Sequence, residues 1–175
     1  MKLLDANLLL HAEDGLSPHH HVAREWLDQQ LSGVAPVCLC WATLTAFLRI
    51  ATNHRIMERP LTCAEASAKV SGWLSQPCVR LVQPTPLHWE ILKKLMQEAG
   101  VTGNLVPDAH LAALAVEHNC TLCSADGDFA RRNRRMTGAI PALLGRFRCR
   151  WKSSVPFAAV GACVRYHRHF LKFSS

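Results

Sequence analysis

The chain has 175 residues, of which 49% are hydrophobic and 19% charged, a composition that suits one globular domain with a buried core. No apolar run approaches the roughly 18 residues that a membrane helix needs, and the N-terminus lacks the order of a signal peptide. We therefore expect a cytoplasmic protein with no membrane partner. The net charge of +7 conceals a division: up to Asp128 acids outnumber Lys and Arg by 13 to 9, whereas from Phe129 onward 11 Lys or Arg and no acid occur.

Short apolar runs alternate with helical patterns along the acidic part. Strands are expected at 2–5, 35–41 and 78–84 and from 120, and helices at 6–14, 19–31, 42–54, 59–74, 86–99 and within 101–119. The strands are continuous apolar runs rather than alternating ones, which is typical of a parallel sheet covered on both faces. The fold class is therefore expected to be α/β with a central parallel sheet.

Four aspartates occupy strand and helix ends. Asp5 ends the first strand, Asp126 and Asp128 follow the last, and Asp108 heads the helix before it, in a position that a helix start also favours without any further role. If the first and last strands are neighbours, Asp5, Asp126 and Asp128 share one sheet edge, and Asp108 joins them if its helix starts there. Clustered carboxylates repel one another unless a hard cation such as Mg²⁺ or Mn²⁺ binds them. Such a site suits metal-dependent phosphoryl transfer.

Five segments in this order resemble the blocks of PIN-domain proteins, specifically VapC-like toxins. They are "LLDANLLLHA", "WATLTAFLRIATN", "VRLVQPTPLHWEIL", "TGNLVPDAHLAALAVEHNCTL" and "SADGDFAR". The similarity covers about residues 1–131, and the last two blocks are the most specific. The resemblance implies a small α/β/α sandwich, Mg²⁺- or Mn²⁺-dependent endoribonuclease activity, a VapB-like antitoxin partner and a homodimer.

By that resemblance, Asp5, Asp108 and Asp126 bind the metal and are catalytic, and Asp128 supports them. Asn7 lies near the first acid and would hydrogen-bond it or its water. One departure is Ala46, where many members carry a Glu. The main alternative is therefore a degenerate PIN module that binds RNA or antitoxin without cleavage. Arg49 and Asn53 would contact RNA phosphate or hold their helix end.

Two further alternatives rest on other residues. A phosphohydrolase of small esters would need a phosphate-binding lysine or Gly-rich loop near the acids, and the sequence offers neither. A zinc-binding interaction protein would use "CTLC" (120–123) and the run His19–His21. We favour core thiols for most of the eight cysteines and a solvated loop or helix start for the histidines.

The basic tail, 132–175, forms a second region that departs from the family. An RNA-binding extension is one interpretation, since Arg and Lys neutralise phosphates and Trp151, Phe147 and Tyr166 offer stacking surfaces. The other is a disordered segment or the product of a shifted reading frame. Both interpretations stay open at this point.

Overall fold

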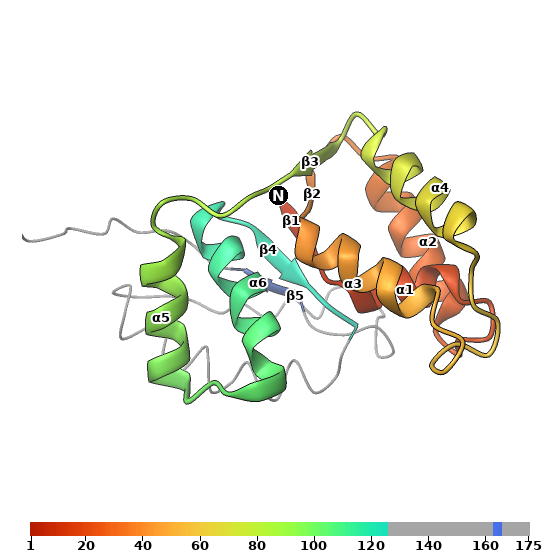
Figure 1. Cartoon of the computed structure of the whole chain (residues 1–175). Coiled ribbons are helices and arrows are strands. Elements are labelled where there is room, and N and C mark those ends of the chain that lie inside the picture. The colour runs from red at the N-terminus through yellow and green to blue at the C-terminus, as the bar shows by residue number, and fades with distance from the viewer. Residues whose placement is uncertain (126–162, 166–175) are drawn as a thin grey trace, which may run out of the picture.

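The computed structural model describes residues 1–125 and 163–165 of the chain (Figure 1). Its sheet has the order β3-β2-β1-β4-β5, in which the first four strands are parallel and β5 pairs antiparallel with β4. The strands are β1 (Lys2–Leu4), β2 (Val37–Leu39), β3 (Val79–Leu81), β4 (Thr121–Cys123) and β5 (Cys163–Arg165). The predicted parallel sheet is confirmed for β1 to β4, and nothing in the sequence pattern had indicated β5.

Helices follow each of the first three strands and precede β4. They are α1 (Ala6–Glu13), α2 (His20–Leu31), α3 (Trp41–Ala51), α4 (Cys63–Leu74), α5 (His88–Ala99), the short η1 (Gly103–Leu105) and α6 (Val106–Glu117). Two helix ends carry sequence features typical of their position. Thr62 and Glu65 form a capping box at the start of α4, and Gly100 ends α5 with φ +61°. The strand predicted at 35–41 extends too far at its C-terminal end, because Trp41 already belongs to α3.

Both faces of the sheet are covered, as the continuous apolar runs predicted. Successive strand residues point to opposite faces, so Leu3 belongs to the core under α5 and α6 while Leu4 belongs to the core under α1 to α4. Leu122 and Cys123 on β4 divide in the same way. Figure 1 shows the two helical layers on either side of the strands. The arrangement is an α/β/α sandwich.

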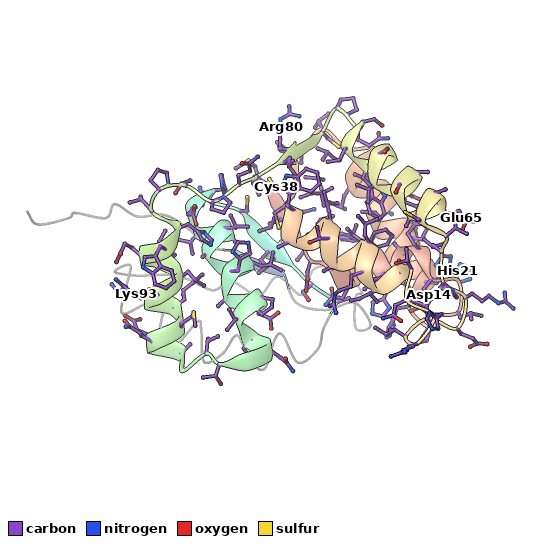
Figure 2. All side chains as sticks on the ribbon, in the orientation of Figure 1. Asp14, His21, Cys38, Glu65, Arg80 and Lys93 are labelled. Atoms are coloured by element: carbon purple, nitrogen blue, oxygen red, sulfur yellow. The ribbon has the colours of Figure 1, made fainter. Side chains whose placement is uncertain are left out.

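At the β3 edge of the sheet, an arginine side chain protects the strand from pairing with another strand. Nη1 of Arg80 on β3 donates to the carbonyl oxygens of Pro77 (2.7 Å) and Val79 (2.9 Å), and its side chain extends from the edge in Figure 2. These contacts occupy carbonyl groups that would otherwise be open to a further strand.

The six cysteines of residues 1–125 are free thiols, and all but Cys63 are buried. Cys120 donates its thiol hydrogen to Cys38 (3.6 Å between sulfurs), which lowers the pKa of Cys38 and raises the pKa of Cys120. The prediction that cysteines fill small core spaces is confirmed for the five buried cysteines. Among the residues that the structure describes, no helix has the length and apolar character needed to cross a membrane.

Candidate active site

Asp5 lies where β1 ends and α1 begins. Its Oδ1 accepts a hydrogen bond from Ala6 N (2.6 Å), so the carboxylate caps α1, and its own N–H donates to Cys123 O (2.9 Å) on β4. A short acidic side chain is suited to this place, because it accepts from the unpaired N–H groups of the first turn. The cap fixes the direction of the carboxylate at the edge of the sheet, where the side chain is half-buried.

A chain of hydrogen bonds joins Asp5 to the residues after β4. Ser124 Oγ, 2% exposed, donates to Asp5 Oδ2 (2.9 Å) and accepts from Asn7 Nδ2 (2.8 Å). Asn7 Oδ1 in turn accepts from Ala125 N (2.9 Å). The carboxyl ends of β1 and β4 are thus bound together by side chains. The sequence analysis required the first strand and the strand from residue 120 to be neighbours, and β1 and β4 are indeed paired.

Ser124 is the site residue that the sequence analysis missed. A small hydroxyl directly after a buried strand was the available signal, but only the pairing of Leu4 with Cys123 shows that Ser124 follows level with Asp5. Asn7 was expected to bind Asp5 or a water. Its contacts in the structure run through Ser124 and Ala125 instead, so it reaches the acid through the serine hydroxyl.

Asp108 lies in the first turn of α6 and is half-buried. Three residues separate α6 from β4, so the helix runs back along the sheet and its first turn lies toward the carboxyl end of β4. Four alanines of α6 are fully buried, and their small side chains let the helix pack closely on the sheet. The alanine-rich segment behind Asp108 therefore has a packing role, and Asp108 lies in the first turn of its helix, as the sequence predicted.

The remaining two predicted acids, Asp126 and Asp128, lie outside the described residues. Among the described residues, which include neither of these acids, no group of three or more His, Cys, Asp or Glu side chains is close enough to hold a metal ion. Asp5 and Asp108 supply hard oxygen donors, which fit Mg²⁺ or Mn²⁺. The carboxylate of Asp5 is fixed at the end of β1 by the bonds from Ala6 N and Ser124 Oγ, and a positioned carboxylate of this kind is compatible with a metal ligand.

Ala46 is half-buried on α3, one turn after Thr43, whose hydroxyl donates to Leu4 O (2.9 Å). The same face of α3 therefore approaches the end of β1 without bringing a carboxylate. Any metal held at this edge must be bound by fewer acids than a Glu at this position would allow. Arg49 and Asn53, the two other residues named in this segment, lie in different environments. Arg49 is exposed, whereas Asn53 accepts from Arg55 N (2.9 Å) and stabilises the turn after the helix.

The model of one protein family, described as "PIN domain", matches residues 2–135 of the chain. The chain belongs to the PIN-domain family. Two similar relatives come from Mycobacterium tuberculosis. The chain is 44% identical to "Ribonuclease VapC37" over 82% of its own length and the whole of the relative, and 46% identical to "Ribonuclease VapC31" over 75% and 92%. These matches confirm the resemblance drawn from the five sequence blocks.

Solved structures support the fold of this PIN domain. The Mycobacterium tuberculosis toxin VapC20, described as cleaving the sarcin–ricin loop, superposes with a TM-score of 0.56 at 16% identity, over 75% of this chain and 94% of the other. A chain of VapBC2 from Rickettsia felis, solved with a promoter DNA fragment, gives 0.51 at 16% identity, over 74% and 91%. At this identity the likeness establishes architecture alone.

Proposed function

We propose that this PIN-domain protein is an endoribonuclease toxin of a toxin–antitoxin pair that acts in the cytoplasm and hydrolyses RNA phosphodiester bonds. The observation that carries the proposal is the hydrogen-bonded junction of Asp5, Ser124 and Asn7 at the neighbouring ends of β1 and β4. It is supported by the ribonuclease names of relatives that match three quarters or more of the chain.

Asp5, Asp108 and Asp126 would hold Mg²⁺ or Mn²⁺, with Asp128 beside them. A divalent ion bound there would lower the pKa of the attacking water and offset the charge on the departing 3′-oxygen. The chain's own contribution is to orient the acids. The α1 cap and the Ser124 hydroxyl hold both oxygens of Asp5, and the first turn of α6 presents Asp108. The metal chemistry that we propose requires no histidine general base.

A VapB-like antitoxin and a second copy of the chain are the proposed partners. The support for the antitoxin is that a VapBC pair is among the structural neighbours. Co-purification of the chain with the product of an adjacent short gene would test that partner, and sedimentation would test the homodimer.

The decisive experiment is cleavage of purified bacterial RNA by the full chain in Mn²⁺, with EDTA as the metal-free control. Asp5→Asn is the informative variant, because asparagine retains the helix cap but removes the charge. Asp14→Asn, at the far end of α1, is the matched control. We expect cleavage by the wild type and by Asp14→Asn, and none by Asp5→Asn or in EDTA.

Ala46 supports one second candidate, a PIN module that binds RNA or antitoxin without cutting. The same experiment separates the two candidates. A wild-type chain that binds RNA in Mn²⁺ but leaves it intact would establish the binding module and exclude the nuclease.

A further inference from the structure

An exposed aromatic side chain lies beside the end of β1. Trp41, the first residue of α3, is 52% exposed. In the same turn, Thr43 donates its hydroxyl to Leu4 O, directly before Asp5. Continuing the pairing of Leu3 with Cys38 by two residues also brings Asp5 level with Cys40, the neighbour of Trp41. The start of α3 therefore lies against the acid that begins the proposed active site.

The solvent face of α3 continues from Trp41 with small and cationic residues. Ala42, Thr45 and Arg49 are exposed, and the helix contains no acidic residue. Arg49 is eight residues beyond Trp41, about 12 Å along the helix axis. The helix packs beside α1, which also starts at the sheet edge (Figure 1). A strip of aromatic, hydroxyl and cationic groups thus leads away from Asp5.

The tight turn that follows α3 carries a second exposed cation. The Asn53 side chain accepts from Arg55 N, and Asn53 O accepts from Met57 N (both 2.9 Å), so the turn leaves Arg55 exposed. Within residues 1–125, Arg49 and Arg55 form no ion pair, and their charges are available to an anion. Arg59 is left out of the strip, because it lines a cavity together with Glu13 and Asp14.

From this arrangement we infer that the exposed face of α3 and the turn after it bind single-stranded RNA, with Trp41 stacking on an unpaired base and Arg49 and Arg55 contacting phosphates. The inference rests on the proposed nuclease function and names how its substrate is held. Aromatic stacking requires a base that is splayed out of a helix, which selects single strands and loops over duplex RNA.

A second exposed tryptophan provides the comparison. Trp89 on α5 is 61% exposed, but its neighbours Glu90 and Lys93 pair with each other (2.7 Å) and α5 also carries Glu98. Figure 2 shows Lys93 of this helix at the opposite end of the molecule from Asp14 and His21. Exposure is thus similar at Trp41 and Trp89, whereas only the helix of Trp41 starts beside Asp5 and lacks acidic residues.

The first test measures binding of a short fluorescein-labelled single-stranded RNA of mixed sequence to the full chain, in EDTA so that the RNA stays intact. Replacing Trp41 by Ala should weaken binding by about 5- to 100-fold, and Trp41→Phe should retain most of the affinity. Trp89→Ala, the matched control, should change it less than about twofold. Equal effects of Trp41→Ala and Trp89→Ala, or none from either, would overturn the inference.

A salt series tests the phosphate contacts. Each lost contact to single-stranded RNA lowers the slope of log affinity against log salt by about 0.7. The double variant Arg49→Gln, Arg55→Gln should therefore lower the slope by about 1.4, whereas Lys94→Gln on α5 should leave it unchanged. An unchanged slope in the double variant would contradict the assignment, as would equal competition by the fully paired form of the same RNA.

Two further readouts separate this inference from the proposed function. In Mn²⁺, Trp41→Ala should raise KM and leave kcat close to the wild-type value. A chain that fails to cleave but loses binding selectively at Trp41 would refute the nuclease and retain the RNA surface. If the wild-type chain cleaves RNA but Trp41→Ala and Trp89→Ala change binding equally, the nuclease is retained and the RNA surface is refuted. If Trp41→Ala instead dissociates a dimer in sedimentation, the face is an interface between copies and the inference fails.

Discussion

Two hydrogen-bonded groups around buried or half-buried acids lie on different parts of this molecule. One joins Asp5 to Ser124 at the carboxyl ends of β1 and β4. The other lies between α5 and α6, where Glu117, with a side chain 1% exposed, binds His88, and His88 contacts His110 (2.8 Å). By residue type the acid–histidine group resembles catalytic machinery more closely. Its place in the fold argues against catalysis, because the Glu117 carboxylate is enclosed between helices. The Asp5–Ser124 group lies instead at the carboxyl ends of the strands.

The contacts of Glu117 explain its burial. One oxygen pairs with His88 Nδ1 and the other accepts from Thr85 N (2.7 Å), so the carboxylate fastens the segment before α5 to the end of α6. His118 strengthens the same junction by contacting Gln83 O (2.8 Å). Burial and neighbouring His88 lower the pKa of His110, and Glu117 opposes that shift. The comparison therefore favours a stabilising role for Glu117 and supports the catalytic role that we propose for the acids of the sheet edge.

The largest expected effect is on catalysis. Asp108→Asn should reduce RNA cleavage by roughly 100-fold or more, since several kcal/mol of transition-state stabilisation would depend on the proposed metal site. The free energy of unfolding should change by less than about 1 kcal/mol, the usual contribution of an acid in a first helical turn. Cleavage rates and urea unfolding measure the two quantities. Glu90→Gln removes an acid from the first turn of α5 and is the control. Full activity of Asp108→Asn would refute its role.

Glu117→Ala should show the opposite pattern. Removing the carboxylate leaves His88 and Thr85 N without their buried acceptor, so the free energy of unfolding should fall by about 3 kcal/mol. Cleavage per folded molecule should stay near the wild-type value at a temperature where the variant is folded. Glu98→Ala, on the exposed side of α5, should change neither quantity. A stable Glu117→Ala variant that has lost cleavage would reverse the comparison.

The sequence predicted the first region better than the second for a physical reason. Asp5 and Asp108 stand at element ends, which patterns of apolar residues reveal, and parallel strands bring their ends to one edge. Glu117, His88 and Thr85 are separated by up to 32 residues, and only the packing of α5 on α6 brings them together. Ser124 was missed for the same reason, because its partner Asp5 is 119 residues away.

Ser124→Ala tests how far positioning matters at the sheet edge. Loss of the hydroxyl leaves Asp5 Oδ2 and Asn7 Nδ2 without this shared partner, and groups that orient metal ligands typically contribute 10- to 100-fold. We expect kcat to fall by about tenfold at low Mn²⁺ with KM little changed, and to recover in part as Mn²⁺ is raised. Ser75→Ala, which removes a hydroxyl bonded to Gly72 O, is the control. A purely structural serine would lower stability without this dependence on Mn²⁺.

The smallest expected effect is on the pH dependence of stability. It concerns a second group of histidines, which lies where α1 meets α2. Burial and the nearby His19 lower the pKa of His11, against a smaller opposing effect of Asp14, and His11 Nδ1 contacts Ser17 Oγ (2.8 Å). Because the folded state binds the proton less readily, the unfolded chain takes up more protons once the pH falls below about 6.5. His11 therefore lowers stability progressively below that pH and has no such effect above it.

Urea unfolding at pH 7.5 and 5.5 measures this effect, and His11→Gln should reduce the loss of stability between the two values. His21→Gln is the control, since His21 shares the α1–α2 region without contacting Ser17. Binding of RNA at pH 7.5 should be the same in both variants, because neither lies on the exposed face of α3. A pH dependence that is identical in the wild type and His11→Gln would show that the proton is taken up elsewhere, and that the histidines of the α1–α2 junction do not share the structural role given to those of α5–α6.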